Sequence, residues 1–143
     1  MNPGSEKDPP SHVFEEHTGE VRLHLDAPEL SALLAEAGRA LAELMTDQPV
    51  RPSVDGPEEV RVRAPDRDAL LVEWLNELIF RSETHKKVYA DVTVLRATDT
   101  ELVASIRGGE PERLKTAVKA ATFHNLRIAE RGGRVSATVV LDV

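Results

Sequence analysis

Cysteine is absent from the 143-residue sequence. This absence excludes disulfide bonds, thiolate nucleophiles, zinc fingers and cysteine-held iron–sulfur clusters. Long apolar runs are absent too, since no window approaches the roughly 18 apolar residues of a membrane-spanning helix. Residues 1–11 have neither the basic start nor the apolar stretch of a secretory signal. We therefore expect a cytoplasmic protein without a membrane partner.

Positive charge and aromatic residues are also scarce. Eighteen Lys and Arg stand against 25 Asp and Glu, which gives a net charge of −7, and the aromatics are one Trp, one Tyr and three Phe. Binding a nucleic-acid backbone requires clustered cations, and binding single strands usually requires aromatic rings on which bases stack. We expect no strong direct nucleic-acid binding, so any RNA involved would be held by another protein.

The length and the 41% hydrophobic content suit one domain with one sizeable core. Residues 1–12 combine Pro, Gly, Ser and charge without a periodic apolar pattern, so their ordering would gain little burial. We predict a flexible N-terminal tail over 1–12 and a single domain over 13–143.

The first half of the domain predicts two strands and two helices. Apolar and polar residues alternate over 21–25 and 60–64, the period of a half-buried strand. One helix should follow Asp26, whose side chain can cap free amides, and end near Met45; Pro65 and Asp66 should open the other. A loop over 47–57 should follow the first helix. The helical stripes are Leu30, Leu33, Leu34, Ala37, Leu41, Leu44 and Met45, then Leu70, Leu71, Trp74, Leu75, Leu78 and Ile79, with Trp74 as a core anchor.

The second half is mainly β-rich. Residues 88–95 and 102–106 predict a hairpin, and 135–141 predict a final strand after the turn at Gly132-Gly133. Residues 111–126 fit a weak helical stripe or a strand face equally, although propensity alone favours a helix. The predicted fold class is α+β, with two amphipathic helices packed on a largely antiparallel β-sheet.

Acidic groups near the two ends of the domain are the main chemical feature. Asp142 closes an apolar strand, where a carboxylate loses hydration unless a cation, a donor or solvent compensates, and the carboxylate of Val143 is adjacent. If Glu20 meets Asp142 in space, the oxygens suit Ca²⁺, Mg²⁺ or Mn²⁺. The alternative is a solvated chain end. His17 could add a nitrogen, but a lone His close to a Glu is more often a local hydrogen-bonding residue.

Lys119 and His124 are further candidates. Their odd separation would place them on opposite faces of a strand, so one of them should be structural. The sequence contains no G-x-S-x-G, Walker A, H-E-x-x-H or G-x-G-x-x-G pattern, and we therefore infer no catalysis and no enzyme.

Five short blocks, taken together and in order, resemble the archease family over about residues 13–143. They are Glu16-His17-Thr18-Gly19-Glu20-Val21, Leu44-Met45-Thr46-Asp47, Trp74-Leu75-Asn76-Glu77-Leu78-Ile79, Val118-Lys119-Ala120-Ala121-Thr122-Phe123-His124 and Val139-Val140-Leu141-Asp142-Val143. The resemblance implies a small α+β protein that activates the GTP-dependent RNA ligase of tRNA splicing and RNA repair. That enzyme joins 2′,3′-cyclic-phosphate or 3′-phosphate ends to 5′-hydroxyl ends, and archeases promote its guanylylation and multiple turnover.

The resemblance also implies a divalent-metal site, with calcium the expected ion, at positions that fall on Glu20, Asp142 and Val143. This sequence has Gly19-Glu20 where the family usually has Ala-Asp, which lengthens the first carboxylate side chain by one methylene. The resemblance favours a strand over Val118–Ile128, and Lys119 is the side chain to test beside the metal.

Two other functions stay open at this stage. One is an adaptor or chaperone for RNA-modifying enzymes, which would bind partners through an exposed apolar patch. The other is a small metal-dependent phosphohydrolase, in which Glu20 and Asp142 would hold the ion and Lys119 would steady negative charge.

Overall fold

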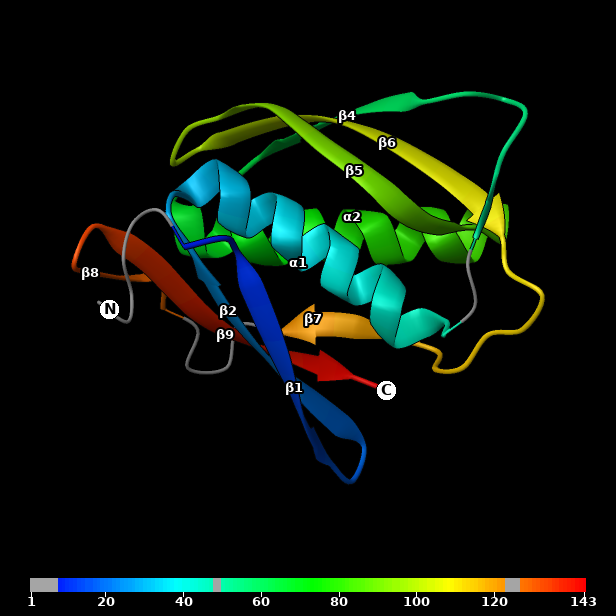
Figure 1. The fold of residues 1–143 in the computed structure, drawn as a ribbon, viewed down its shortest axis with the longest axis horizontal. Coiled ribbons are helices and arrows are strands. Elements are labelled where there is room, and N and C mark those ends of the chain that lie inside the picture. The colour runs from blue at the N-terminus through cyan, green and yellow to red at the C-terminus, as the bar shows by residue number, and fades with distance from the viewer. Residues whose placement is uncertain (1–7, 48–49, 123–126) are drawn as a thin grey trace.

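A computed structural model describes residues 8–47, 50–122 and 127–143 (Figure 1). The described residues form two helices, α1 (Leu30–Met45) and α2 (Arg67–His85). The strands are β1 (Ser11–His17), β2 (Glu20–Ala27), β3 (Arg51–Pro52), β4 (Glu58–Arg63), β5 (Val88–Ala97), β6 (Glu101–Glu110), β7 (Ala120–Thr122), β8 (Ala129–Arg131) and β9 (Arg134–Asp142).

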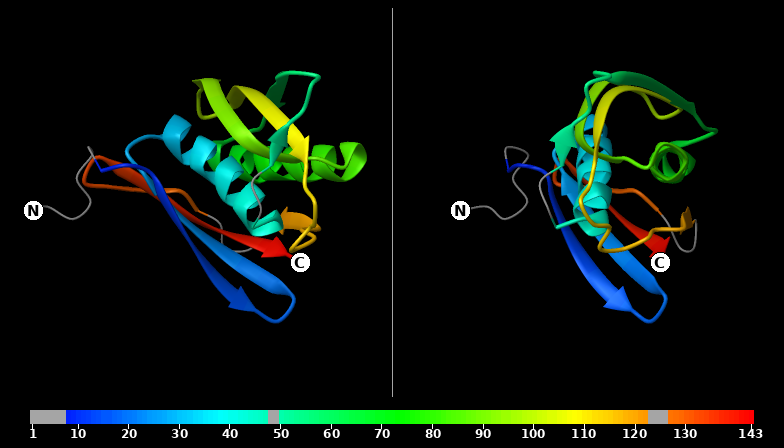
Figure 2. Two further views of the ribbon diagram at one scale, coloured as in Figure 1. Left: turned by 45° about the vertical axis from the view of Figure 1, so that its right-hand side comes forward. Right: turned by 90° about the vertical axis from the view of Figure 1, so that its right-hand side faces the viewer.

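The two helices lie between two antiparallel sheets (Figures 1 and 2). The first sheet has the order β1-β2-β9-β7, with β8 also paired to β9, and the second has the order β3-β6-β4, with β5 also paired to β6. The α+β class, the two helices and the β5–β6 hairpin are confirmed. The strands form two sheets instead of the single sheet predicted, because α1 buries residues around most of its circumference and needs cover on both sides.

The two helices begin differently. Asp66 caps α2 as predicted, because its Oδ1 accepts a hydrogen bond from the Ala69 amide at 2.8 Å. The prediction that Asp26 caps α1 is wrong. Asp26 lies in β2, and its Oδ2 accepts hydrogen bonds from the nearly buried Arg134 guanidinium at 2.6 and 3.0 Å; the residue at the α1 cap position, Glu29, makes no side-chain cap.

Trp74 anchors the core, as predicted. Its ring is fully buried, and its Nε1 donates to the Leu34 carbonyl of α1 at 2.8 Å. Gly38 lets this packing occur, because a Cβ there would lie 3.2 Å from both the Trp74 ring and a Val92 methyl. The contact therefore joins α1, α2 and β5 of the second sheet.

The N-terminal boundary differs by two residues from the predicted tail over 1–12. β1 begins at Ser11, and the His12 ring contacts two α1 carboxylates, with Nδ1 2.6 Å from Glu36 and Nε2 2.7 Å from Glu43. Since β1 pairs along its length with β2, these contacts fix the edge of the first sheet on α1.

The segment of ambiguous pattern is a strand over a shorter range than Val118–Ile128. β7 covers Ala120–Thr122, while residues 111–119 form an irregular connection, and His124 lies outside the described residues. Within the described chain, neither helix has the length and apolar character needed to cross a membrane.

Candidate functional site

Glu20 and Asp142 are directly opposite each other on neighbouring strands. Glu20 is the first residue of β2 and Asp142 the last of β9, and the antiparallel register pairs them, with Ala120 of β7 on the other side of Asp142. Side chains of directly opposed residues have Cβ atoms about 4.5–5.5 Å apart. The fold therefore brings together two of the residues that the sequence singled out, across 122 positions of chain.

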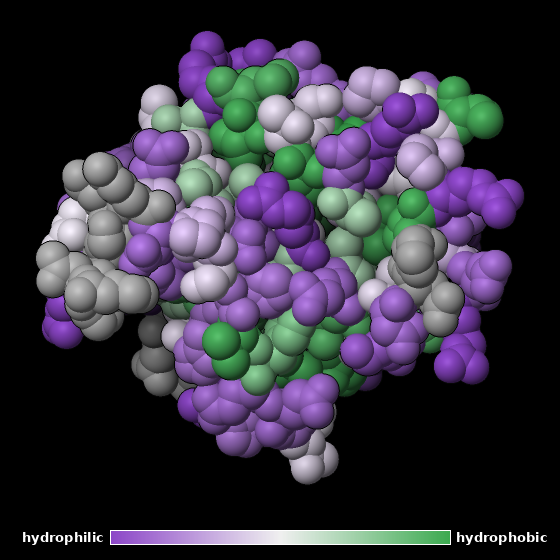
Figure 3. All heavy atoms as spheres, viewed as in Figure 1, coloured by the Kyte–Doolittle hydropathy of each residue, from purple (hydrophilic) through white to green (hydrophobic). Residues whose placement is uncertain are grey.

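The two carboxylates share the face of the sheet that points away from the helices. Val21 and Leu23 of β2, and Val139 and Leu141 of β9, are buried in the core. Because strand side chains alternate between faces, Glu20 and Asp142 lie on the opposite, outer face. Hydrophilic residues gather over the end of the β1–β2 hairpin at the bottom of Figure 3.

A tight turn sets the position of Glu20. Thr18 and Gly19 connect β1 to β2, and Gly19 has φ +78°, a left-handed conformation that favours glycine. Space is not the reason for glycine there, since a Cβ would meet nothing within 4 Å. An alanine at this position would therefore strain the backbone that positions the first carboxylate.

Two backbone hydrogen bonds hold the end of β9 between the hairpin and β7. The Val143 amide donates to the Gly19 carbonyl at 3.2 Å, and the Lys119 amide donates to the Asp142 carbonyl at 2.8 Å. Glu20, Asp142, Val143 and the backbone of Lys119 thus lie at one end of the first sheet. Lys119 also lines a neighbouring cavity at the ends of the helices.

Asn76 of α2 supports this end of the sheet, a role that the sequence reasoning missed. Its Oδ1 accepts from the Ala121 amide at 2.8 Å, and its Nδ2 donates to the Ala121 carbonyl at 3.1 Å. These bonds fix β7, and with it the backbone of Lys119, on the helix. The available signal was a polar amide between the apolar positions Leu75 and Leu78 of the predicted stripe.

The oxygens of this site suit a hard divalent cation better than zinc. Among residues 8–47, 50–122 and 127–143, no three His, Asp or Glu side chains gather closely enough to hold a metal ion. The side chains of Glu20 and Asp142 could supply two carboxylates to such an ion, and the main chain of Val143 could add a third oxygen.

Comparisons with known proteins show the family to which this chain belongs. The model of the Archease protein family matches residues 13–143. "Protein archease" of Methanopyrus kandleri is 35% identical over 139 residues, covering 90% of this chain and 96% of its own. "Protein archease" of Methanothermobacter thermautotrophicus is 33% identical, covering 80% of this chain and 86% of its own. The chain belongs to the archease family.

Two solved structures share the archease fold. The solution structure of protein 1598 from Methanobacterium thermoautotrophicum has a TM-score of 0.73 and 27% identity, and covers 92% of this chain and 98% of its own. A crystal structure of an archease from Thermotoga maritima has a TM-score of 0.68 and 20% identity, and covers 90% of this chain and 94% of its own.

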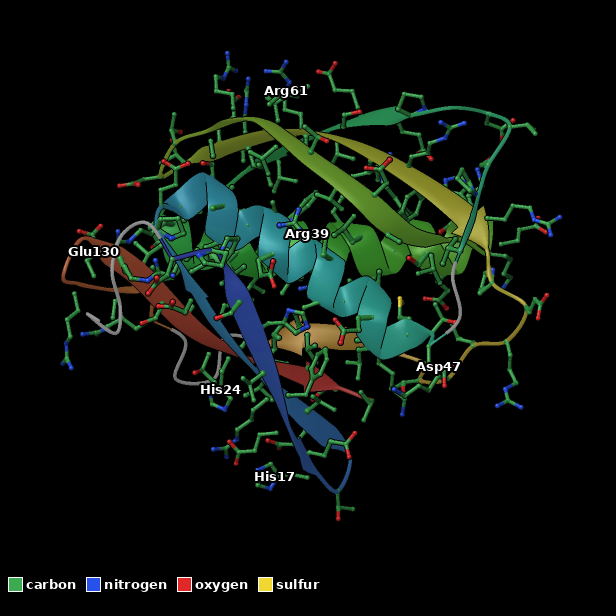
Figure 4. The ribbon with its side chains drawn as sticks, in the orientation of Figure 1. His17, His24, Arg39, Asp47, Arg61 and Glu130 are labelled. Carbon is green, nitrogen blue, oxygen red and sulfur yellow. The ribbon has the colours of Figure 1, made fainter. Side chains whose placement is uncertain are left out.

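Local hydrogen bonds involve both His17 and Glu20 in this archease. His17, near the hairpin turn, contacts Glu15 through Nε2 at 2.8 Å, and His24 contacts the other Glu15 oxygen at 2.9 Å (Figure 4). The hydrogen bond with His24, followed by that with His17, lowers the pKa of Glu15. Glu20 accepts a long bond from Arg22 Nε at 3.4 Å, which a metal ion would have to compete with. His17 is thus engaged with Glu15 in this structure.

Proposed function

We propose that this archease is a non-enzymatic activator of the GTP-dependent RNA ligase that joins 2′,3′-cyclic-phosphate or 3′-phosphate ends to 5′-hydroxyl ends. It would promote guanylylation of the ligase and its multiple turnover in tRNA splicing or RNA repair. Membership of the archease family supports a helper role, and the net charge of −7 supports recognition of a protein in preference to RNA.

The observation that carries the proposal is the opposed pair of Glu20 and Asp142. We propose that their carboxylates and that of Val143 hold one divalent ion, Ca²⁺ in the first instance, with Mg²⁺ and Mn²⁺ as alternatives. A bound ion would add positive charge beside the two opposed carboxylates, where Arg22 contacts Glu20 at 3.4 Å. Glu20 and Asp142 would orient that charge toward the partner, while the bond from Val143 to Gly19 keeps the chain end in place.

The test is a reconstituted joining reaction. Purified ligase, GTP and RNA ends are assayed for guanylylation and multiple-turnover joining, alone and with the wild-type protein, Asp142→Ala, Glu20→Ala or the control Glu59→Ala, an exposed carboxylate on β4 of the second sheet. Wild type and the control should accelerate both steps, and the two site variants should not. Equal rates in all conditions, including ligase alone, would reject the activator function.

A second candidate has one observation in its favour. The related crystal structure from Thermotoga maritima is described as an archease and a possible chaperone. An adaptor or chaperone would stabilise the ligase, or another RNA-modifying enzyme, against heat without changing the rate of guanylylation, so a melting curve of the ligase with and without this protein separates the two functions. Phosphate release by this protein alone, abolished by a chelator, would instead favour a phosphohydrolase.

A further inference from the structure

An open cavity of about 580 Å³ lies beside the proposed metal site, at the C-terminal ends of α1 and α2. Its floor is apolar and includes the buried side chains of Met45, Ile79, Val88 and Val118. One wall is the irregular connection of residues 111–119, which runs from β6 past the end of α1 into β7 (Figure 1). On this wall Leu114 is 49% exposed.

The rim of the cavity is cationic although the whole chain is acidic. Lys86, Lys87, Arg113 and Lys119 line it, against the acidic Glu83 and Glu112. Lys87 pairs with Asp55 at 3.3 Å, whereas the other three cations make no ion pair within the described part of the chain. An apolar floor with unpaired cations around it is complementary to an apolar group flanked by carboxylates.

Capping of the helices explains only part of this charge. Lys86 follows α2, where a cation is favourable beside the helix C-terminus. At the end of α1, however, the Met45 carbonyl already accepts hydrogen bonds from the Lys115 and Thr116 amides at 2.7 and 3.3 Å. The Met45 carbonyl therefore needs neither Arg113 nor Lys119 as a donor.

We propose that this cavity docks an acidic segment of the partner protein that carries one large aliphatic side chain, an inference that rests on the proposed activator function. The aliphatic side chain occupies the floor, and Asp or Glu residues beside it meet Arg113, Lys86 and Lys119. A nucleotide fits less well, because no aromatic ring for base stacking is present among the described lining residues.

The position of the cavity connects docking to the proposed metal site. Lys119 is one of the residues that line the cavity, and its amide donates a hydrogen bond to the carbonyl of Asp142 at 2.8 Å. A segment bound in the cavity thus places the partner protein against the Glu20–Asp142 edge. The same contact accounts for a rim that opposes the overall charge of the molecule.

The experiment measures affinity of purified, full-length protein for the purified ligase by biolayer interferometry, at low salt and at about 0.5 M salt. The test variant is the double substitution Arg113→Glu and Leu114→Asp. Its matched control is Leu95→Asp with Arg96→Glu, an adjacent Leu-Arg pair on β5 in which Leu95 is 58% exposed. Thermal melts establish that both variants fold. A third variant, Glu112→Gln, removes negative charge from the rim.

The test variant should bind the ligase at least about tenfold more weakly, because it loses an apolar contact and reverses a charge. The control should bind within about twofold of wild type, and Glu112→Gln should bind more tightly at low salt. If wild type activates and the test variant binds the ligase as wild type does, the docking proposal is overturned and the activator function stands. If wild type neither binds nor activates, the activator function itself fails. The same variants are also tested for binding of a fluorescent guanine nucleotide. If the test variant binds this nucleotide more weakly than wild type but binds the ligase equally well, the docking proposal is overturned in favour of a nucleotide site.

Discussion

Glu101 and Asp142 are carboxylates on different sheets with very different surroundings. Glu101, on β6, accepts from Arg63 at 2.9 Å and from Arg96 at 2.5 Å, and lies 3.5 Å from Arg61. Asp142, on β9, faces Glu20 in the register and has no ion pair among the residues that the structure describes. Figure 4 shows Arg61 on the outer face of the second sheet, on the opposite side of the molecule from His17.

The two carboxylates therefore differ in whether the chain itself neutralises their charge. The carboxylate of Glu101 is compensated by three guanidinium groups, so folding alone explains it. The Glu20–Asp142 pair places like charges on directly opposed positions, an arrangement that destabilises a sheet unless a cation lies between them. Arg22, at 3.4 Å, compensates Glu20 in part, and the divalent ion that we propose would compensate Asp142 as well.

The largest expected effect is stabilisation by calcium. If Ca²⁺ binds the folded protein only, a concentration of 100 times Kd raises the free energy of unfolding by about 2.7 kcal/mol. Thermal melts with Ca²⁺ or with a chelator should show this increase for wild type. Asp142→Asn should lower the Ca²⁺ affinity by about tenfold or more, since even residues that only orient metal ligands contribute about 10–100-fold.

The matched control for that experiment is Glu101→Gln, which removes a carboxylate from the other sheet. Its response to Ca²⁺ should equal that of wild type, because arginines already surround this position. Appending one glycine after Val143 tests whether a main-chain carboxylate takes part in the site. If Ca²⁺ stabilises Asp142→Asn as much as wild type, Asp142 does not bind the ion and the contrast with Glu101 is lost.

The second effect is an alkaline loss of stability through Tyr89 of β5. This phenol is 3% exposed and donates to Glu58 at 3.1 Å; burial, followed by the charge of Glu58, raises its pKa to about 12. The ordinary value of an unfolded chain is about 10, so the stabilisation is complete below pH 10 and is lost as pH rises to 12. This difference between the two pKa values corresponds to about 2.7 kcal/mol in the free energy of unfolding.

Tyr89→Phe should therefore be less stable than wild type at pH 7, by about 1.5 kcal/mol for a hydrogen bond to a charged group, and this difference should disappear as pH rises above 10. Urea unfolding at pH 7–11 measures it, and the absorbance of the single tyrosine reports the ionisation directly. A constant difference across that range would show that the phenol ionises freely in the folded state.

Local sequence patterns predicted the placement of Glu20 and Asp142 better than the contacts that support this end of the sheet. Alternation placed Val21 and Leu141 on buried faces and thus Glu20 and Asp142 on the other faces, because strand periodicity is local information. Their pairing depended on register, which the family resemblance indicated and the antiparallel β2–β9 ladder provides. Metal binding itself remains a prediction.

Local sequence patterns could not predict contacts between residues that are distant in the sequence. Asp26 has the residue type of a helix cap, but Arg134, distant in sequence, binds it in β2. The second sheet was missed as a separate layer, since a helix stripe shows that a face is buried and not what covers it. The Asn76 bonds to β7 depend on a three-residue strand, too short for periodicity to reveal.

The smallest expected effect concerns Glu101 itself. Hydrogen bonds from Arg63, and then from Arg96, lower the pKa of this carboxyl below its ordinary value. Its stabilisation is therefore present at neutral pH and is lost as pH falls through the lowered folded pKa. Glu101→Gln should melt slightly below wild type at pH 7 and low salt, and the difference should shrink both in acid and at about 1 M salt, where exposed charges are screened within about 3 Å. Thermal melts at pH 7, 5 and 3 measure this difference in stability.

A large difference between Glu101→Gln and wild type that persists at high salt would mean that Glu101 supports the second sheet by more than exposed ion pairs. The contrast with Asp142 would then lie in packing as well as in charge.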